Sequence, residues 1–225
     1  MIPWVQLGAA TVPDGGGELR LMRRGAEFSI LASAIELMNS RLSGSEEALA
    51  RATCARLQGR PAPRVLIGGL GLGFTLRAAL ADLGPGAAVT VAELVPEVVA
   101  WGRGPLARIH GSGLTDPRVA IFEGDVSDLI AGAAAGYDAI LLDVDNGPAG
   151  LTRAANDGLY GAAGLARARA ALRPGGVLAV WSAGPHPAFA KRLGGVGFAV
   201  EELRVRANGR GRGGARHVIW LATKR

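Results

Sequence analysis

The chain has 225 residues, a mass of 23.0 kDa and a formal net charge of +6, from 25 basic and 19 acidic side chains. Hydrophobic residues make up 49% and charged residues 20%, a composition typical of globular domains that excludes a disordered or collagen-like chain. The sequence contains no apolar run of the roughly 18 residues that a membrane span needs, and we expect no signal peptide. The single cysteine, Cys54, excludes an intramolecular disulfide, so we expect a cytoplasmic protein.

The first 60 residues are predicted to form a small β segment and one helix. Short strand patterns occur at residues 18–22, 27–32 and 35–38. Acidic side chains then mark the first turn of a helix at about residues 45–57, with Ser45 as its predicted N-cap. The Gly- and Pro-containing stretch at 59–63 is interpreted as a linker, which divides the chain into a segment at 1–60 and a main domain at 61–225.

The main domain alternates apolar runs with helical patterns. Strands are expected at residues 65–67, 88–92, 118–122, 137–142, 177–181, 198–207 and 217–222. Helices are expected at residues 72–83, 96–108, 126–135, 159–172 and 187–193. This alternation predicts an α/β fold, with a mainly parallel sheet covered by helices on both faces. Because no helix separates the last two strands, we expect them to pair antiparallel.

A glycine-rich loop follows the first strand of the main domain. Residues 68–73 read Gly-Gly-Leu-Gly-Leu-Gly, which gives Gly69, Gly71 and Gly73 a G-x-G-x-G spacing. The dinucleotide fingerprint needs G-x-G-x-x-G, and Phe74 occupies its third glycine position. The spacing therefore favours a nucleoside held without a pyrophosphate. The alternative is a turn without a binding role.

Acidic residues follow the next three strands, at the edge where open α/β sheets bind ligands. Glu93 is predicted to accept hydrogen bonds from ribose hydroxyls, and its alternative role is a capping or surface acid. Asp125 is predicted to accept from an adenine amino group, to act as an N-cap, or both. Asp143 is predicted to lie beside the reacting atoms, where it can hold or deprotonate an amine nucleophile. Asp145 and Asn146 also fit a turn.

Several weaker signals remain. Tyr160 is expected either to pack at a helix start or to touch the acceptor, and Trp181 is expected to pack in the core. Five arginines surround glycines near the C-terminus and could hold RNA phosphates, although a solvated loop is the simpler interpretation; they are Arg204, Arg206, Arg210, Arg212 and Arg216. No spacing of His, Asp or Glu predicts a metal site.

Several segments occur together in an order and spacing that resemble one family. They are residues 65–73, Glu93, residues 123–125, residues 137–143, residues 159–160 and residues 172–178. Residues 35–225 resemble the spermidine synthase-like branch of the class I S-adenosylmethionine-dependent methyltransferases. The resemblance implies a Rossmann-like seven-stranded sheet whose last strand is antiparallel, after a short N-terminal β-hairpin segment. It also implies a nucleoside site at Gly69, Gly71, Glu93 and Asp125, with Asp143 at the acceptor.

The sequence departs from true spermidine synthases at the acceptor site. Those enzymes have an acid inside the glycine loop, where this chain has Leu70 and Leu72. Ser45 stands where they have a tyrosine, and residues 181–183, Trp-Ser-Ala, replace their Gln-Gly-Glu. Each difference removes a group suited to a cationic polyamine.

The resemblance implies a transferase that uses S-adenosylmethionine, or its decarboxylated form, as co-substrate and needs no metal. The expected reaction moves a methyl or aminopropyl group to a small amine, with a slight preference for methyl transfer. Glu46, Asp145 and Tyr160 are candidate acceptor contacts beside Asp143. The alternatives are a polyamine aminopropyltransferase, an RNA methyltransferase and a non-catalytic nucleoside-binding scaffold. We also expect a homodimer formed through the N-terminal hairpin, because an isolated hairpin is marginally stable.

Overall fold

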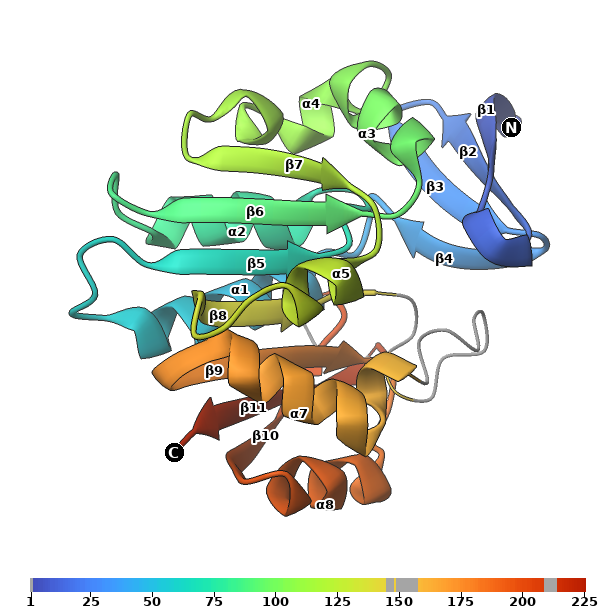
Figure 1. Cartoon of the computed structure of the whole chain (residues 1–225). Helices are drawn as coiled ribbons and strands as arrows, with labels where there is room; N and C mark the ends of the chain where they lie inside the picture. Colours follow the sequence, from blue (N-terminus) through green and yellow to red (C-terminus); the bar gives the residue numbers. More distant parts are fainter. Residues whose placement is uncertain (1, 145–147, 149–157, 209–213) are drawn as a thin grey trace.

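The computed structural model describes residues 2–144, 148, 158–208 and 214–225, which form two sheets and their covering helices (Figure 1). The smaller sheet contains β1 (Val5–Thr11), β2 (Glu18–Arg24), β3 (Glu27–Ala32) and β4 (Ile35–Asn39). The larger sheet contains β5 (Arg64–Gly68), β6 (Ala88–Glu93), β7 (Val119–Glu123), β8 (Tyr137–Leu142), β9 (Leu172–Ser182), β10 (Phe198–Arg206) and β11 (Arg216–Lys224). The helices are α1 (Gly44–Cys54), α2 (Phe74–Asp82), α3 (Pro96–Arg103), α4 (Ala107–His110), α5 (Val126–Ala131), α7 (Ala162–Ala171) and α8 (Pro187–Gly195).

The larger sheet has seven strands in the order β10-β11-β9-β8-β5-β6-β7. The strand β5 pairs parallel with β6 and β8, and the parallel pairing continues to β7 on one side and β9 on the other. The last strand, β11, inserts between β9 and β10 and runs antiparallel to both. This arrangement confirms the predicted Rossmann-like sheet with an antiparallel last strand, and the predicted pairing of the final two strands.

Helices cover both faces of this sheet because its central strands are apolar on both sides. Leu66 and Ile67 of β5 are fully buried and point to opposite faces. In Figure 1, α1 and α2 lie behind the sheet, and α5, α7 and α8 lie in front of it. Each face has its own apolar core, one containing Ile67 with Leu76 of α2 and the other containing Leu66 with Leu165 of α7. The prediction of helices on both faces is thus confirmed.

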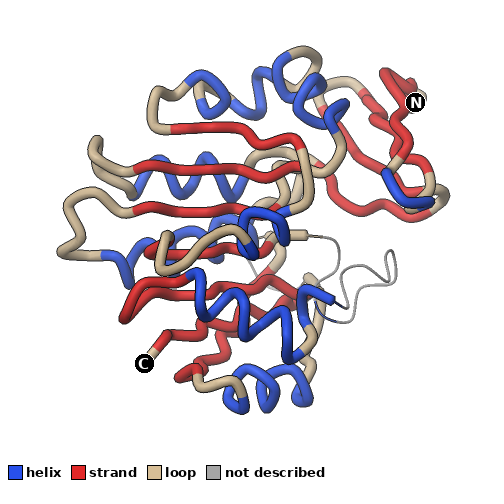
Figure 2. Tube along the Cα trace, in the orientation of Figure 1, coloured by secondary structure: helices blue, strands red, loops and turns tan. Residues whose placement is uncertain are grey.

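The small antiparallel sheet lies beyond the carboxyl ends of β5 and β6 (Figures 1 and 2). Leu21 of β2 and Ile30 of β3 are buried in the same apolar core as Leu49 of α1. The small sheet therefore packs on the main sheet's helices and forms one side of the space above the strand ends. The division of the chain at residues 60 and 61 remains a prediction.

The structure differs from the sequence-based expectations at several elements. The strand β1 was not predicted, because Val5–Thr11 contains Gly8 and two alanines and shows little alternation. The predicted helix at 96–108 ends at Arg103, since Pro105 disfavours helical backbone at Gly104 before it. The prediction of Ser45 as an N-cap is wrong, because the N-cap position of α1 is Ser43. Ser45 is a buried residue inside the helix.

A buried carboxylate, Asp138, joins several segments at the opposite end of the sheet. Asp138 of β8 is only 2% exposed and accepts hydrogen bonds from the Arg60 guanidinium, from the backbone N–H of Arg64 (2.7 Å) and from Nη1 of Arg173 (2.9 Å). The carboxylate therefore connects the segment before β5 to the first residues of β8 and β9.

We predict that Asp138→Ala lowers the free energy of unfolding by about 2–3 kcal/mol, because it removes hydrogen bonds made to a buried charge. Urea denaturation measures this change. The control is Glu202→Ala, which removes the exposed ion pair between Glu202 and Arg204 and should change stability by less than about 0.5 kcal/mol. Equal effects of the two substitutions would contradict the assigned role of Asp138.

Candidate active site

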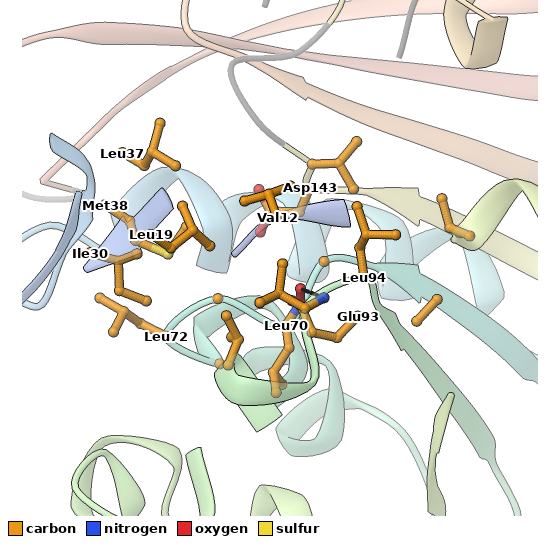
Figure 3. A pocket seen from close by; sticks show the side chains of 18 of the residues that line it. Val12, Leu19, Ile30, Leu37, Met38, Leu70, Leu72, Glu93, Leu94 and Asp143 are labelled. Carbon is orange, nitrogen blue, oxygen red and sulfur yellow. Dashed lines mark hydrogen bonds between the residues drawn. The ribbon is translucent and has the colours of Figure 1, made fainter. Parts of the chain in front are cut away.

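A pocket lies where the carboxyl ends of β5, β6 and β8 face the small sheet (Figure 3). The glycine-rich loop at residues 69–73 forms one side of it, and side chains of the small sheet, including Leu37 and Met38, form another. The pocket brings together seven of the residues that the sequence indicated for a site: Glu46, Gly69, Gly71, Gly73, Glu93, Asp125 and Asp143.

The glycine loop has backbone conformations that residues other than glycine rarely adopt. Gly69, Gly71 and Gly73 have φ angles of +89°, +49° and +78°, in the left-handed region that favours glycine. A Cβ at Gly69 would lie 2.4 Å from the carbonyl oxygen of Asp143, and one at Gly73 would lie 2.3 Å from Nδ1 of His110. Gly69 and Gly73 are therefore needed to pack the loop against the protein.

Glu93, at the end of β6, is hydrogen-bonded to the backbone of this loop. Its Oε2 accepts the backbone N–H of Leu70 at 2.9 Å, and its Oε1 accepts the N–H of Val95 at 3.0 Å. Burial raises the pKa of this carboxyl, while the backbone hydrogen bonds act in the opposite direction. The backbone N–H groups of Gly71 and Leu94 also act on this carboxylate, so the role that the structure shows for Glu93 is to position the loop at the edge of the pocket.

Asp125 caps a helix at the same edge of the sheet. Its Oδ1 accepts the backbone N–H of Ser127 at 2.8 Å, which makes it the N-cap of α5. The side chain also lines the pocket. The structural role expected for Asp125 is thus present, and its position still allows the predicted contact with a ligand.

Asp143 and Glu46 bring two carboxyl groups to one end of the pocket. Oδ2 of Asp143 lies 2.5 Å from Oγ1 of Thr75, and the same hydroxyl lies 3.4 Å from the backbone carbonyl oxygen of Glu46. Burial, together with the negative charge of Glu46, raises the pKa of Asp143 to about 7, although the Thr75 hydrogen bond lowers it. Burial also raises the pKa of Glu46. Near neutral pH the two carboxyl groups can therefore bind a cation or exchange a proton with one.

The sequence did not indicate how Glu46 is held. Oγ of Ser45 donates to Oε2 of Glu46 at 2.7 Å and lies 2.9 Å from Nδ1 of His217, on β11. Because a serine hydroxyl has one proton, the ionised Glu46 requires Nδ1 of His217 to be the donor to Ser45. Trp181 packs edge-on against His217, with ring centroids 4.7 Å apart, and lines the pocket as well. No local motif links residues 45 and 217, so only the fold reveals this connection.

Other predicted contacts lie elsewhere. Tyr160 is buried in the core beside Phe189, with ring centroids 5.7 Å apart, and is not among the residues that line the pocket. Asp145, Asn146, Arg210 and Arg212 lie outside the described residues.

The charge of the pocket is opposite to that of the whole chain. Within the described part of the chain, four carboxyl side chains line the pocket and no Lys or Arg does. This environment favours a cationic ligand over an anionic one. Among the described residues, no group of three His, Cys, Asp or Glu side chains is arranged to hold a metal ion. In the same part of the chain, no helix is long and apolar enough to cross a membrane.

Comparison with known proteins shows similarity in structure. No family model matches the sequence, and no curated protein matches it. The spermidine synthase of Thermotoga maritima matches with a TM-score of 0.78 and 17% identity, over 98% of this chain and 73% of that one. A spermidine synthase in complex with the transition-state analogue AdoDATO matches with a TM-score of 0.77 and 16% identity, over 98% and 72% of the two chains. TrmN of Thermus thermophilus matches with a TM-score of 0.57 and 24% identity, over 88% and 56%.

These similarities define the fold. The chain has the Rossmann-like fold of class I methyltransferases, and the small N-terminal sheet is included in the match to the spermidine synthases, which spans nearly the whole chain. The resemblance inferred from the sequence is therefore confirmed at the level of structure.

We predict that Asp143 makes the stability of the protein depend on pH. Its pKa is about 7 in the folded protein against 3.8 as the ordinary value, so the folded state binds more protons between these values. Stability associated with this group is complete below pH 4 and is lost as the pH rises through 7. The melting temperature of Asp143→Asn, measured relative to that of the wild type at the same pH, should therefore rise as the pH is raised from 4 to 8. Asp128→Asn, at an exposed position of α5, is the control. A constant difference between Asp143→Asn and the wild type across this range would contradict the prediction.

Proposed function

We propose that the protein transfers an alkyl group from an S-adenosyl sulfonium compound to an amine. The observation that carries this proposal is the acidic pocket, which joins a glycine loop and Glu93 on one side to the Asp143 and Glu46 carboxyl groups on the other. Glu93 would accept hydrogen bonds from the ribose hydroxyls, and Asp125 would accept one from the adenine amino group. The similarity in fold to spermidine synthases supports the same assignment.

The reaction needs positioning more than covalent chemistry. The amine nitrogen attacks the carbon attached to sulfur, the new C–N bond forms, and the C–S bond breaks with its electron pair going to sulfur. An acceptor that binds as an ammonium ion first gives a proton to Asp143, which frees the electron pair of its nitrogen for this attack. After the transfer the sulfonium charge has disappeared and the alkylated nitrogen carries the positive charge. Holding the amine in line with the sulfonium accounts for about 7–11 kcal/mol of barrier lowering when the alignment is good.

Two versions of the donor fit this scheme, and we favour methyl transfer from S-adenosylmethionine. Leu70 and Leu72 of the glycine loop are buried and apolar, so they offer no anion to an aminopropyl ammonium group. One observation favours the second version, aminopropyl transfer. The described lining has no Lys or Arg to pair with the carboxylate of S-adenosylmethionine, and the decarboxylated donor lacks that group.

The remaining alternatives make different demands on the site. An RNA methyltransferase needs cationic side chains near its pocket to bind phosphates, and the described lining contains carboxylates instead. A non-catalytic scaffold would bind the nucleoside without needing Glu46 and Asp143 in one place.

Transfer activity tests the proposal through Asp143. Asp143→Asn keeps the size of the side chain but cannot accept the proton, so the transfer rate should fall about 10²–10⁴-fold. Nucleoside affinity, measured by calorimetry, should stay within about twofold, since Asp143 contributes to the acceptor end. Asp128→Asn again serves as the matched control and should transfer at the wild-type rate. Full activity of Asp143→Asn with an amine acceptor would exclude Asp143 as the base.

We propose that two chains associate through β1. Apolar residues of the N-terminal hairpin such as Leu21 and Ile30 are buried within the chain itself and require no partner. The edge strand β1 and the residues before it nevertheless expose large apolar side chains: Ile2, Trp4, Val5 and Leu7. Pairing of β1 with its copy would cover this edge.

Light scattering measures the mass directly. We expect twice 23.0 kDa for the wild type and a monomer for a Val5→Lys, Leu7→Lys double variant, because charges on an edge strand oppose pairing. Ile35→Lys, on the other edge strand, should remain a dimer. A wild-type mass of one chain at micromolar concentration contradicts the proposal.

A further inference from the structure

The small sheet contributes an apolar side to the pocket. Leu19, Leu37 and Met38 come from β2 and β4, line the pocket and are only half-buried. Val12, which follows β1, and Ile30 of β3 complete this wall. In the view of Figure 3, Leu19, Ile30, Leu37 and Met38 lie together on one side, and Val12 lies closer to Asp143. We call this group the apolar wall.

The charged groups of the acceptor region lie at one end of the wall. Glu46 comes from α1 and Asp143 from the end of β8, and Thr75 contacts both. The other two acids of the lining serve the nucleoside side, where Glu93 holds Leu70 and Asp125 caps α5. Within the described lining, therefore, the acceptor region has one anionic end and an apolar body.

This arrangement separates two classes of amine. The ammonium group of a monoamine can pair with Glu46 and Asp143 while its apolar tail leaves water against the apolar wall. A diamine has a second ammonium group, and burying that charge against Leu37 or Met38 without a partner is strongly unfavourable. Each methylene that leaves water strengthens binding about fourfold, which adds to the advantage of the monoamine.

From this distribution of charge we infer that the acceptor is a monoamine with an apolar body, its amino group held by Glu46 and Asp143 and its body packed on Leu19, Leu37 and Met38. The inference rests on the proposed function, since it concerns the acceptor of that same reaction.

Calorimetric titration of amines tests the inference without requiring turnover. Butylamine is compared with 1,4-diaminobutane, and hexylamine with 1,6-diaminohexane, on the full-length protein with and without bound methylthioadenosine. We expect each monoamine to bind at least about tenfold tighter than the diamine of equal length, and hexylamine to bind tighter than butylamine. Equal or tighter binding of the diamines, or no binding of any amine, overturns the inference.

A substitution in the apolar wall sharpens the test. Leu37→Glu places a carboxylate in the apolar wall in addition to Glu46 and Asp143, so it should strengthen diamine binding about tenfold and weaken monoamine binding. Ile35→Glu is the matched control, because Ile35 belongs to the same strand, is 53% exposed and does not line the pocket. Circular dichroism checks the fold of each variant, and Leu19→Glu replaces Leu37→Glu if the latter does not fold. An unchanged preference in the folded variant overturns the inference.

The titrations keep this inference separate from the proposed function. Binding of methylthioadenosine tests the nucleoside site alone. If it binds and diamines are preferred, the acceptor class is wrong while the proposed transferase stands. If it does not bind, the proposed function fails, and the titrations on the free protein still decide which class of amine the apolar wall prefers.

Discussion

The approach of Gly69 to the main chain of Asp143 sets the geometry of the whole site. The backbone N–H of Asp143 donates to the carbonyl oxygen of Gly68 at 3.0 Å. The backbone N–H of Gly69 donates to the carbonyl oxygen of Ala92 at 2.8 Å. Three neighbouring parallel strands, β8, β5 and β6, are thereby joined where they end. A Cβ at Gly69 would lie 2.4 Å from the Asp143 carbonyl oxygen, so only glycine allows this contact. The spacing between the glycine loop and Asp143 is therefore set by the backbone rather than by flexible side chains.

The small N-terminal sheet gives the pocket its character. The main sheet alone would present Glu93, Asp125 and Asp143 to water, as parallel sheets do at their carboxyl edge. By covering that edge, the small sheet and α1 reduce the access of water to the carboxyl groups, and burial is the largest cause of the raised pKa of Asp143. The same sheet supplies apolar surface such as Leu37. One packing arrangement thus produces both the electrostatics of the site and its shape.

Much of the fold could be predicted because it follows from local patterns. The alternation of apolar runs and helical stretches predicts the parallel sheet, and the missing helix before β11 predicts its antiparallel pairing. Ligands bind at the carboxyl edge of open α/β sheets, and this rule alone predicts that Glu93, Asp125 and Asp143 lie in one region. The strand β1 could not be predicted, because its glycine and alanines have no strong strand preference.

The contacts that complete the site could not be predicted, because they join residues far apart in the sequence. Ser45 looked like a helix cap, yet it bridges Glu46 and His217. Leu37 and Met38 fall in the strand predicted at 35–38, and that pattern does not indicate that their side chains line the pocket. Patterns in the sequence reveal which residues share an element, whereas the side chains that one element presents to another depend on tertiary packing.

The central claim is that the acidic pocket binds an S-adenosyl nucleoside through Glu93 and the glycine loop. Calorimetric titration of the wild type and of Glu93→Gln with S-adenosylmethionine, its decarboxylated form and methylthioadenosine tests it most directly. The control is Glu97→Gln, an exposed glutamate on α3. We expect one site per chain in the wild type and in Glu97→Gln, and affinity at least about tenfold weaker in Glu93→Gln, since a hydrogen bond to a charged group is lost. Absence of binding for all three nucleosides, or equal affinity in Glu93→Gln, would contradict it.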